Sequence, residues 1–311
     1  MGHRLEERIA TCIKKALPVA FKTSLWFLKI MLPVSFVVLL LSYFDILPYL
    51  SSLADPFFEF LGLPGNAALV FITSIFTNIY TVIALMSGLE FTVREGIILA
   101  VMCLISHNYL LETIVQSKTG SSAWSMVALR LLCSFAAALI LNAILPELSV
   151  KTVSQTAVAY TFGETLLNWC QQSLVLIVKV VSIITLLMIM QRLLEEFGVL
   201  NKLSAFFAPL MLGMGLSRKV SFLWVIGNTL GLAYGSAVIL DYARQGKMSK
   251  AEVNLLNYHL AVSHSQLEDP LLFSVLGLPV LWLLFPRFIL AIAVVWLKRI
   301  WDWGMKRYSY K

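Results

Sequence analysis

Eight apolar runs, each about 20 residues long, divide this 311-residue chain. They lie at about 22–44, 66–88, 95–116, 122–146, 173–194, 219–240, 251–275 and 279–299. A helix needs roughly 20 apolar residues to cross the hydrocarbon core of a bilayer. Only 13% of the residues are charged and 59% are hydrophobic, whereas a soluble domain carries about 25% charged residues. A water-soluble fold would expose large apolar patches, so we predict an all-α polytopic membrane protein.

The positive charge of the chain, a net +7, is spread between the apolar runs. Basic residues in such places favour the cytoplasmic side of a membrane. They do not gather into one patch, so we expect membrane lipid rather than nucleic acid as a partner. Residues 1–21 place basic side chains between apolar ones, which predicts a basic amphipathic helix lying on the membrane.

Two parts of the chain repeat each other in order. FDILPYLSSLADPFFEFLGL (44–63) aligns with FGVLNKLSAFFAPLMLGMGL (197–216) at an offset of 153. After an insertion of four residues near 241–246 the offset becomes 157. The residues of the first copy that are then matched identically are Glu95, Ser106, His107, Leu110 and Arg130. We predict two repeats, 22–146 and 173–299, with a linker at 147–172 and a basic cytoplasmic tail at 300–311.

The distribution of basic residues indicates that the two repeats are inverted. If 66–88 and 219–240 are re-entrant hairpins and 46–62 and 199–215 are interfacial helices, each repeat crosses the membrane three times. The outer segments then hold only Arg94 and Lys151 as basic residues. Four spans per repeat would instead place several basic residues outside, against the positive-inside rule. We expect both termini in the cytoplasm of a prokaryote and the spans in its plasma (inner) membrane.

Two related motifs contain most of the ionisable residues that lie within the apolar runs. They are SHNYLLET (106–113) and SHSQLEDP (263–270). A charge at bilayer depth is costly, so such residues are functional candidates. His264 and Glu268 are one helical turn apart and can face one cavity. His107 and Glu112 are five residues apart, which fits a shared site if the helix breaks near Asn108.

The chemistry of these motifs leaves several ligands open. Imidazole and carboxylate together bind divalent cations, and histidine also transfers protons near neutral pH. The neighbouring hydroxyl and amide groups suit a polar solute. The substrate-binding candidates are Ser106, His107, Glu112, Ser263, His264, Glu268, Asp269, Asn78 and Asn228. The metal-ligand candidates among them are His107, Glu112, His264, Glu268 and Asp269.

Arg130, Arg287 and His259 have two interpretations each, whereas Pro270 has one. Arg130 and Arg287 either extend to the membrane interface or neutralise Glu112 and one of Glu268 and Asp269. Pro270 removes a helical hydrogen bond and predicts a break in the second copy. His259 either lines the site or belongs to the core.

Taken together, these features resemble the Gate (nucleoside recognition domain) membrane proteins. That family is similar in architecture to the pore of ferrous-iron permeases and to the core of concentrative nucleoside transporters. The resemblance covers roughly 22–299, and its most specific residues are His264, Glu268, Asp269 and Pro270. The first copy departs from the second at Leu111 and Thr113, and no P-loop of a GTPase is present.

The resemblance implies a secondary transporter that moves a small polar solute, nucleoside-like, or an ion by alternating access. One alternative is a divalent metal cation permease, and another is a non-transporting membrane subunit of a larger complex. We expect no enzymatic activity, since the H-E-x-x-H arrangement of zinc proteases is absent. No fixed cofactor is expected; a coupling proton or cation is left open, and so is assembly into a homo-oligomer.

Overall fold

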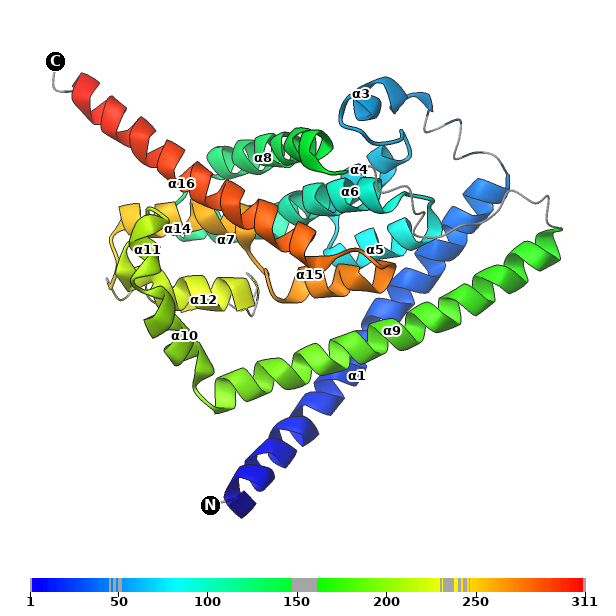
Figure 1. Ribbon diagram of the computed structural model, residues 1–311, viewed down its shortest axis with the longest axis horizontal. Coiled ribbons are helices and arrows are strands. Elements are labelled where there is room, and N and C mark those ends of the chain that lie inside the picture. The colour runs from blue at the N-terminus through cyan, green and yellow to red at the C-terminus, as the bar shows by residue number, and fades with distance from the viewer. Residues whose placement is uncertain are drawn as a thin grey trace.

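The computed structural model describes residues 2–44, 52–146, 161–229 and 247–309, with 46, 49, 231, 238, 239, 242 and 245. Every regular element in this part of the chain is a helix (Figure 1). The first half contains α1 (Gly2–Tyr43), α3 (Asp55–Phe60), α4 (Ala67–Phe76), α5 (Ile79–Gly88), α6 (Val93–Ser106), α7 (Tyr109–Lys118) and α8 (Ala123–Ile144). The second half contains α9 (Phe162–Glu196), α10 (Val199–Phe207), α11 (Leu210–Gly213), η1 (Arg218–Val220), α12 (Ser221–Thr229), α14 (Lys250–Ser263), α15 (Glu268–Phe273), η2 (Ser274–Leu276) and α16 (Val280–Ser309).

Three of the described helices are long and apolar enough to cross a membrane, namely α8, α9 and α16. The pair α6 and α7, bent by 42° at its break, would make a fourth span. Fewer than half of the residues in the three long apolar windows are buried, which is the pattern of helices that face lipid. The prediction of an all-α polytopic membrane protein is therefore confirmed.

Helix α6 lies at the centre of the helix assembly and packs against α4, α8, α14 and α16. Its residues from Gly96 to Ser106 are all buried, because the segment is apolar on every side. In Figure 1 the long helices α1 and α9 cross on one side of this centre, and α16 and α8 lie on the other. Helix α1 packs along α9, and α14 packs along α16.

The segments Thr92-Val-Arg-Glu95 and Ser249-Lys-Ala-Glu252 have the sequence pattern of a capping box, and both boxes are formed. The Thr92 and Ser249 side chains each accept the backbone N–H three residues on, and Glu95 and Glu252 accept in return. Each box starts a helix of 14 residues that ends directly before a histidine of the motif. The caps thus fix where His107 and His264 stand at the ends of α6 and α14.

The helix break predicted near Asn108 is present, and an equivalent break follows α14. Asn108 has φ 52° and Ser265 has φ 51°, a left-handed conformation that is unusual for residues other than glycine. The N–H of Asn108 donates to the carbonyls of Ser74 and Thr77 at 2.9 and 2.8 Å. The N–H of Ser265 donates to the carbonyl of Gly227 at 3.0 Å. Protein groups thus satisfy the irregular backbone, as burial in a membrane requires.

The segments predicted as re-entrant hairpins also contain helix ends. In 66–88, helix α4 stops before Thr77 and α5 begins after Asn78, both of which are extended. In 219–240, helix α12 ends at Thr229, and residues 230 and 232–237 lie outside the described residues. The re-entrant path of 66–88 and 219–240 stays a prediction. The interfacial placement of 46–62 and 199–215 and the inverted orientation of the two repeats also stay predictions.

Three of the predicted domain boundaries lie within helices. Residues 2–43 form one helix, so no helix end separates the predicted surface helix 1–21 from the apolar run 22–44. Helix α9 starts at Phe162, after a third capping box that Thr161 and Glu164 form, so the last part of the predicted linker 147–172 is helical. Helix α16 continues to Ser309 and so contains residues 300–309 of the predicted tail. In each case the helix continues past a change in polarity, because hydropathy alone does not end a helix. Pro18 and Pro33 lie within α1, and Pro286 lies within α16.

Candidate functional site

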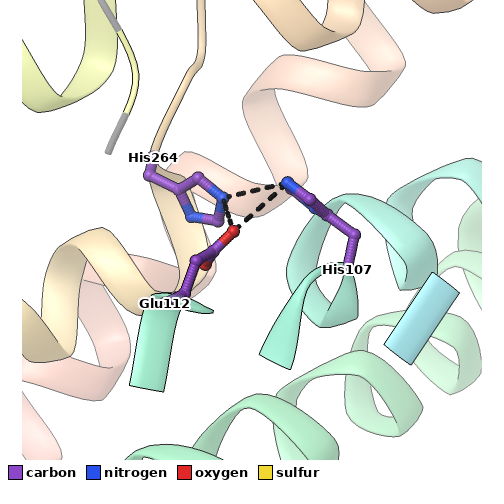
Figure 2. Close-up of side chains that lie close together, drawn as sticks. All are labelled: His107, Glu112 and His264. Atoms are coloured by element: carbon purple, nitrogen blue, oxygen red, sulfur yellow. Dashed lines mark hydrogen bonds and ion pairs between the residues drawn. The ribbon is translucent and has the colours of Figure 1, made fainter. Parts of the chain in front are cut away.

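His107, Glu112 and His264 meet at the two helix breaks (Figure 2). Glu112 Oε1 lies 3.3 Å from His107 Nε2 and 3.2 Å from His264 Nε2. The two Nε2 atoms are 3.5 Å apart. All three side chains are buried, with His264 only 1% exposed. We call these three residues the triad; it joins the first half of the chain to the second.

The other ring nitrogen of each histidine fixes which tautomer is present. His107 Nδ1 lies 3.2 Å from the carbonyl oxygen of Cys103, and His264 Nδ1 lies 2.9 Å from that of Leu260. A carbonyl oxygen only accepts, so each Nδ1 carries a proton, and in the neutral form of each imidazole Nε2 presents a lone pair. Three electron-pair donors, two imidazole nitrogens and a carboxylate oxygen, therefore converge on one point.

Two buried arginines hold the breaks in place. Arg130 Nε donates to the carbonyl of Ile105 at 2.7 Å and a second nitrogen donates to that of His107. Arg287 does the same with Val262 at 3.1 Å and with His264 at 2.7 Å. Arg130 and Arg287, and the residues whose carbonyls they bind, are related by the 157-residue offset of the sequence repeat.

Both arginine side chains are 0% exposed, so extension to the membrane interface is wrong for them. Arg130 lies 3.0 Å from Glu112 Oε2 and so neutralises that carboxylate, as predicted. Arg287 has no carboxylate oxygen within 4 Å among the described residues. Its predicted pairing with Glu268 or Asp269 is therefore not formed. Two of its nitrogens bind backbone carbonyls, and Nη1 has no hydrogen-bond partner among the described residues.

Glu268 does not join His264, which corrects the sequence prediction. Helix α14 ends at Ser263 and α15 begins at Glu268, so the two residues are not on one helical turn. Glu268 instead accepts hydrogen bonds from Tyr80 on α5 and Gln191 on α9, each at 3.3 Å. The break precedes Pro270, which lies in the first turn of α15, where proline is tolerated. Asp269 does approach the triad, with Oδ2 3.9 Å from His107 Nε2.

The remaining predicted residues surround the breaks rather than the triad. The Ser106 hydroxyl is 3.4 Å from that of Tyr109, and Ser263 Oγ is 2.7 Å from Nδ1 of His259. Asn78 caps α5 through the N–H of Thr81. The backbone carbonyl of Asn228 accepts the N–H of Leu267, and its side chain donates to the Trp224 carbonyl.

His259 belongs to the core. It is fully buried, accepts from the indole N–H of Trp224 at 3.2 Å and packs edge-on against Phe288.

Tyr80 and Gln191 contact the carboxylate of Glu268 but were not predicted from the sequence. Tyr80 lies two residues after Asn78, and Gln191 lies near the end of an apolar run. A polar residue in such a run is the signal that could have indicated Gln191. Nothing in the sequence connects either residue to Glu268, since the pairs are 188 and 77 residues apart.

The fold and the triad together define an α-helical polytopic membrane protein with a buried cluster of two histidines and a glutamate at paired helix breaks. Residues 24–121 match the Gate family, described as nucleoside recognition, so the resemblance to Gate proteins is confirmed over this segment. The uncharacterized membrane protein YvoD of Bacillus subtilis is 29% identical over 295 residues, 91% of this chain and 94% of the relative. No solved structure matches the chain significantly.

Proposed function

We propose that this protein is a membrane permease for a divalent transition-metal cation, which the triad binds during passage. The observation that carries the proposal is the convergence of three lone pairs on one buried point. With both Nδ1 protons fixed on backbone carbonyls, no proton of the neutral histidines lies between the three donors. A cation at this point would replace their mutual repulsion with three coordination bonds.

The distances within the triad suit a tetrahedral ion. Bond lengths of about 2.0–2.1 Å to nitrogen and oxygen place tetrahedral ligands about 3.3 Å apart. The three separations in the triad are 3.2, 3.3 and 3.5 Å. Two imidazoles and one carboxylate suit zinc and similar ions rather than magnesium or calcium, which prefer oxygen ligands. The hydrogen bonds from Nδ1 to carbonyls are those that commonly orient metal-binding histidines.

The origin of the ligands favours transport over permanent binding. His107 and Glu112 come from the first half of the chain and His264 comes from the second. A movement between the halves would remove His264 from the other two ligands and so weaken the site. A site shared by two halves that move against each other is the arrangement found in alternating-access transporters. The Gate family implies a transport-related role rather than catalysis, which agrees with this proposal.

A second candidate is a proton-coupled transporter of a polar solute. Its support is that an added proton on either Nε2 would also relieve the repulsion in the triad, through a hydrogen bond to Glu112 Oε1. The family description, nucleoside recognition, points to the class of solute. Under this proposal the triad carries the coupling proton and the solute binds elsewhere between the halves.

Calorimetry of Zn²⁺ binding to the purified protein in detergent separates these proposals. We expect one high-affinity site in the wild type, and loss of at least about 100-fold in affinity for His264→Gln and Glu112→Gln, because a zinc ligand has been removed. His259→Gln is the matched control, since it removes a buried histidine from the same helix outside the triad, and it should bind Zn²⁺ like the wild type. Absence of Zn²⁺ binding to the wild type would refute the cation permease and leave the proton-coupled transporter.

A further inference from the structure

Asp269 faces the triad without belonging to it. Its Oδ2 lies 3.9 Å from His107 Nε2, and the residue is only 6% exposed. This oxygen has no hydrogen-bond partner within the part of the chain that the structure describes. A buried carboxylate oxygen without a donor is costly, so it indicates that a ligand is missing on this side of the triad.

The sequence repeat explains why the Asp269 carboxylate does not reach the triad. At the offset of 157, Asp269 corresponds to Glu112, which reaches both histidines at 3.2 and 3.3 Å. An aspartate is shorter by one methylene, or about 1.5 Å along the chain. The site is therefore nearly symmetric, with three ligands in place and a fourth carboxylate just out of reach.

Glu268 is the next carboxylate beyond Asp269, on the side away from the triad. Its two oxygens accept from the Tyr80 hydroxyl and from the Gln191 amide, each at 3.3 Å. Both donors are uncharged and both bonds are long, so an arriving cation can replace them. No ion pair forms with Glu268 among the described residues, in contrast to Glu112, which Arg130 neutralises.

Gln191 also lines a cavity between α1 and α9. The cavity has a volume of about 230 Å³ and is bounded by Ala16, Val19, Met188, Gln191, Arg192 and Glu195. One side of Gln191 therefore meets this cavity while its amide binds Glu268. The first repeat has Leu111 at the position of Glu268, so the acidic continuation exists on one side of the triad only.

We propose that Glu268 and Asp269 form an acidic passage through which a divalent cation moves between the α1–α9 cavity and the triad. This inference rests on the proposed function of the triad. Glu268 receives the cation as Gln191 and Tyr80 release the carboxylate. Asp269 then passes it to His107, and the reverse order releases it. Carboxylate oxygens along a buried path replace water molecules around the cation and so lower the barrier that a bare cation meets there.

The passage makes a kinetic prediction for Glu268→Gln. An intermediate station lowers the barrier in both directions, so its loss should slow Zn²⁺ association and dissociation together, each at least about tenfold. The equilibrium affinity should change much less than in Glu112→Gln. Stopped-flow measurements follow these rates, with Zn²⁺ and a fluorescent chelator mixed with the purified protein. The matched control is Glu59→Gln, since Glu59 is an exposed carboxylate on α3.

Asp269→Glu tests the same proposal by a gain rather than a loss. The added methylene should bring the carboxylate into the fourth coordination position. Four protein ligands make a closed site, which is typical of structural rather than exchanging zinc. We expect Zn²⁺ affinity to rise at least about tenfold and dissociation to slow, while transport into proteoliposomes falls.

Three results would overturn the passage. One is wild-type exchange rates in Glu268→Gln, and another is unchanged affinity in Asp269→Glu. A third is a loss of affinity in Glu268→Gln as large as in Glu112→Gln, which would make Glu268 a ligand. Each of these leaves Zn²⁺ binding to the triad intact and so spares the proposed function. Absence of Zn²⁺ binding to the wild type would overturn both.

Discussion

The ion pair between Arg130 and Glu112 should be the most costly interaction at the site to break. Arg130 contacts Glu112 Oε2 at 3.0 Å, donates to two backbone carbonyls and lies 4.6 Å from the centre of the Tyr109 ring. Arg130→Gln removes the positive charge and leaves the carboxylate buried at 4% exposure. Breaking a buried pair from one side costs about 3–5 kcal/mol, so the free energy of unfolding should fall by that amount in addition to the loss of the two hydrogen bonds to backbone carbonyls.

Arg287 provides a matched comparison within the same molecule. It donates to the equivalent carbonyls, those of Val262 and His264, and is equally buried. It lacks a carboxylate partner within 4 Å among the described residues. Arg287→Gln therefore loses charged hydrogen bonds, worth about 1.5–3 kcal/mol each at most, without leaving a carboxylate uncompensated. The excess cost of Arg130→Gln over Arg287→Gln measures the ion pair.

A double-mutant cycle isolates that pair. In Arg130→Gln combined with Glu112→Gln no unpaired charge stays buried, so the double variant should be more stable than the sum of the single losses predicts. A coupling energy of about 1–3 kcal/mol is expected for charges in direct contact. Reversible unfolding in mixed micelles with increasing denaturing detergent gives the three free energies. Additivity within about 0.5 kcal/mol, or equal costs for the two arginines, would refute the assignment of Arg130 as the counter-charge.

Three further predictions concern the fold. If the repeats are inverted, a cysteine at Glu59 should react with a membrane-impermeant reagent from outside and one at Lys202 only from inside; labelling from one side would exclude inversion. Gly62→Ala should cost at least about 1 kcal/mol, because φ is +75° and a Cβ would lie 2.0 Å from Asn142 Oδ1; wild-type thermal stability would contradict this. Asn108→Val should destabilise the break by about 1–2 kcal/mol while Asn108→Gly should not, and equal melting temperatures would argue against the left-handed conformation.

Several features of the site follow from the sequence alone. The spacing of five between His107 and Glu112 required a helix break near Asn108, and the break is there. The capping boxes at Thr92 and Ser249 set where α6 and α14 start, and both are formed. These are local features, since a cap or a left-handed residue acts within a few positions of the chain.

Short-range sequence rules did not predict where the Glu268 side chain lies, and they put two domain boundaries inside α1 and α9. Counting four residues from His264 assumed that α14 continues, whereas it ends at Ser263 and sends Glu268 toward Tyr80. The change from basic to apolar residues near position 21 suggested a boundary, but α1 continues through it and accommodates Pro18 within the helix. Helix direction after a break depends on the carbonyls available to the freed N–H groups, and those belong to distant segments.

The sequence thus determined which residue types lie in the interior of the protein, and the sequence repeat determined that these residues occur in pairs. Only the tertiary structure decided that His107 and His264, 157 residues apart, approach within 3.5 Å, and that Glu112 rather than Glu268 completes the set. It also decided that Arg130 has a carboxylate partner, whereas Arg287 has none among the residues that the structure describes. Pairing between distant residues depends on how two helix breaks pack against each other, and side-chain length then selects the contact: the longer glutamate reaches both histidines, whereas Asp269 ends 3.9 Å from one of them.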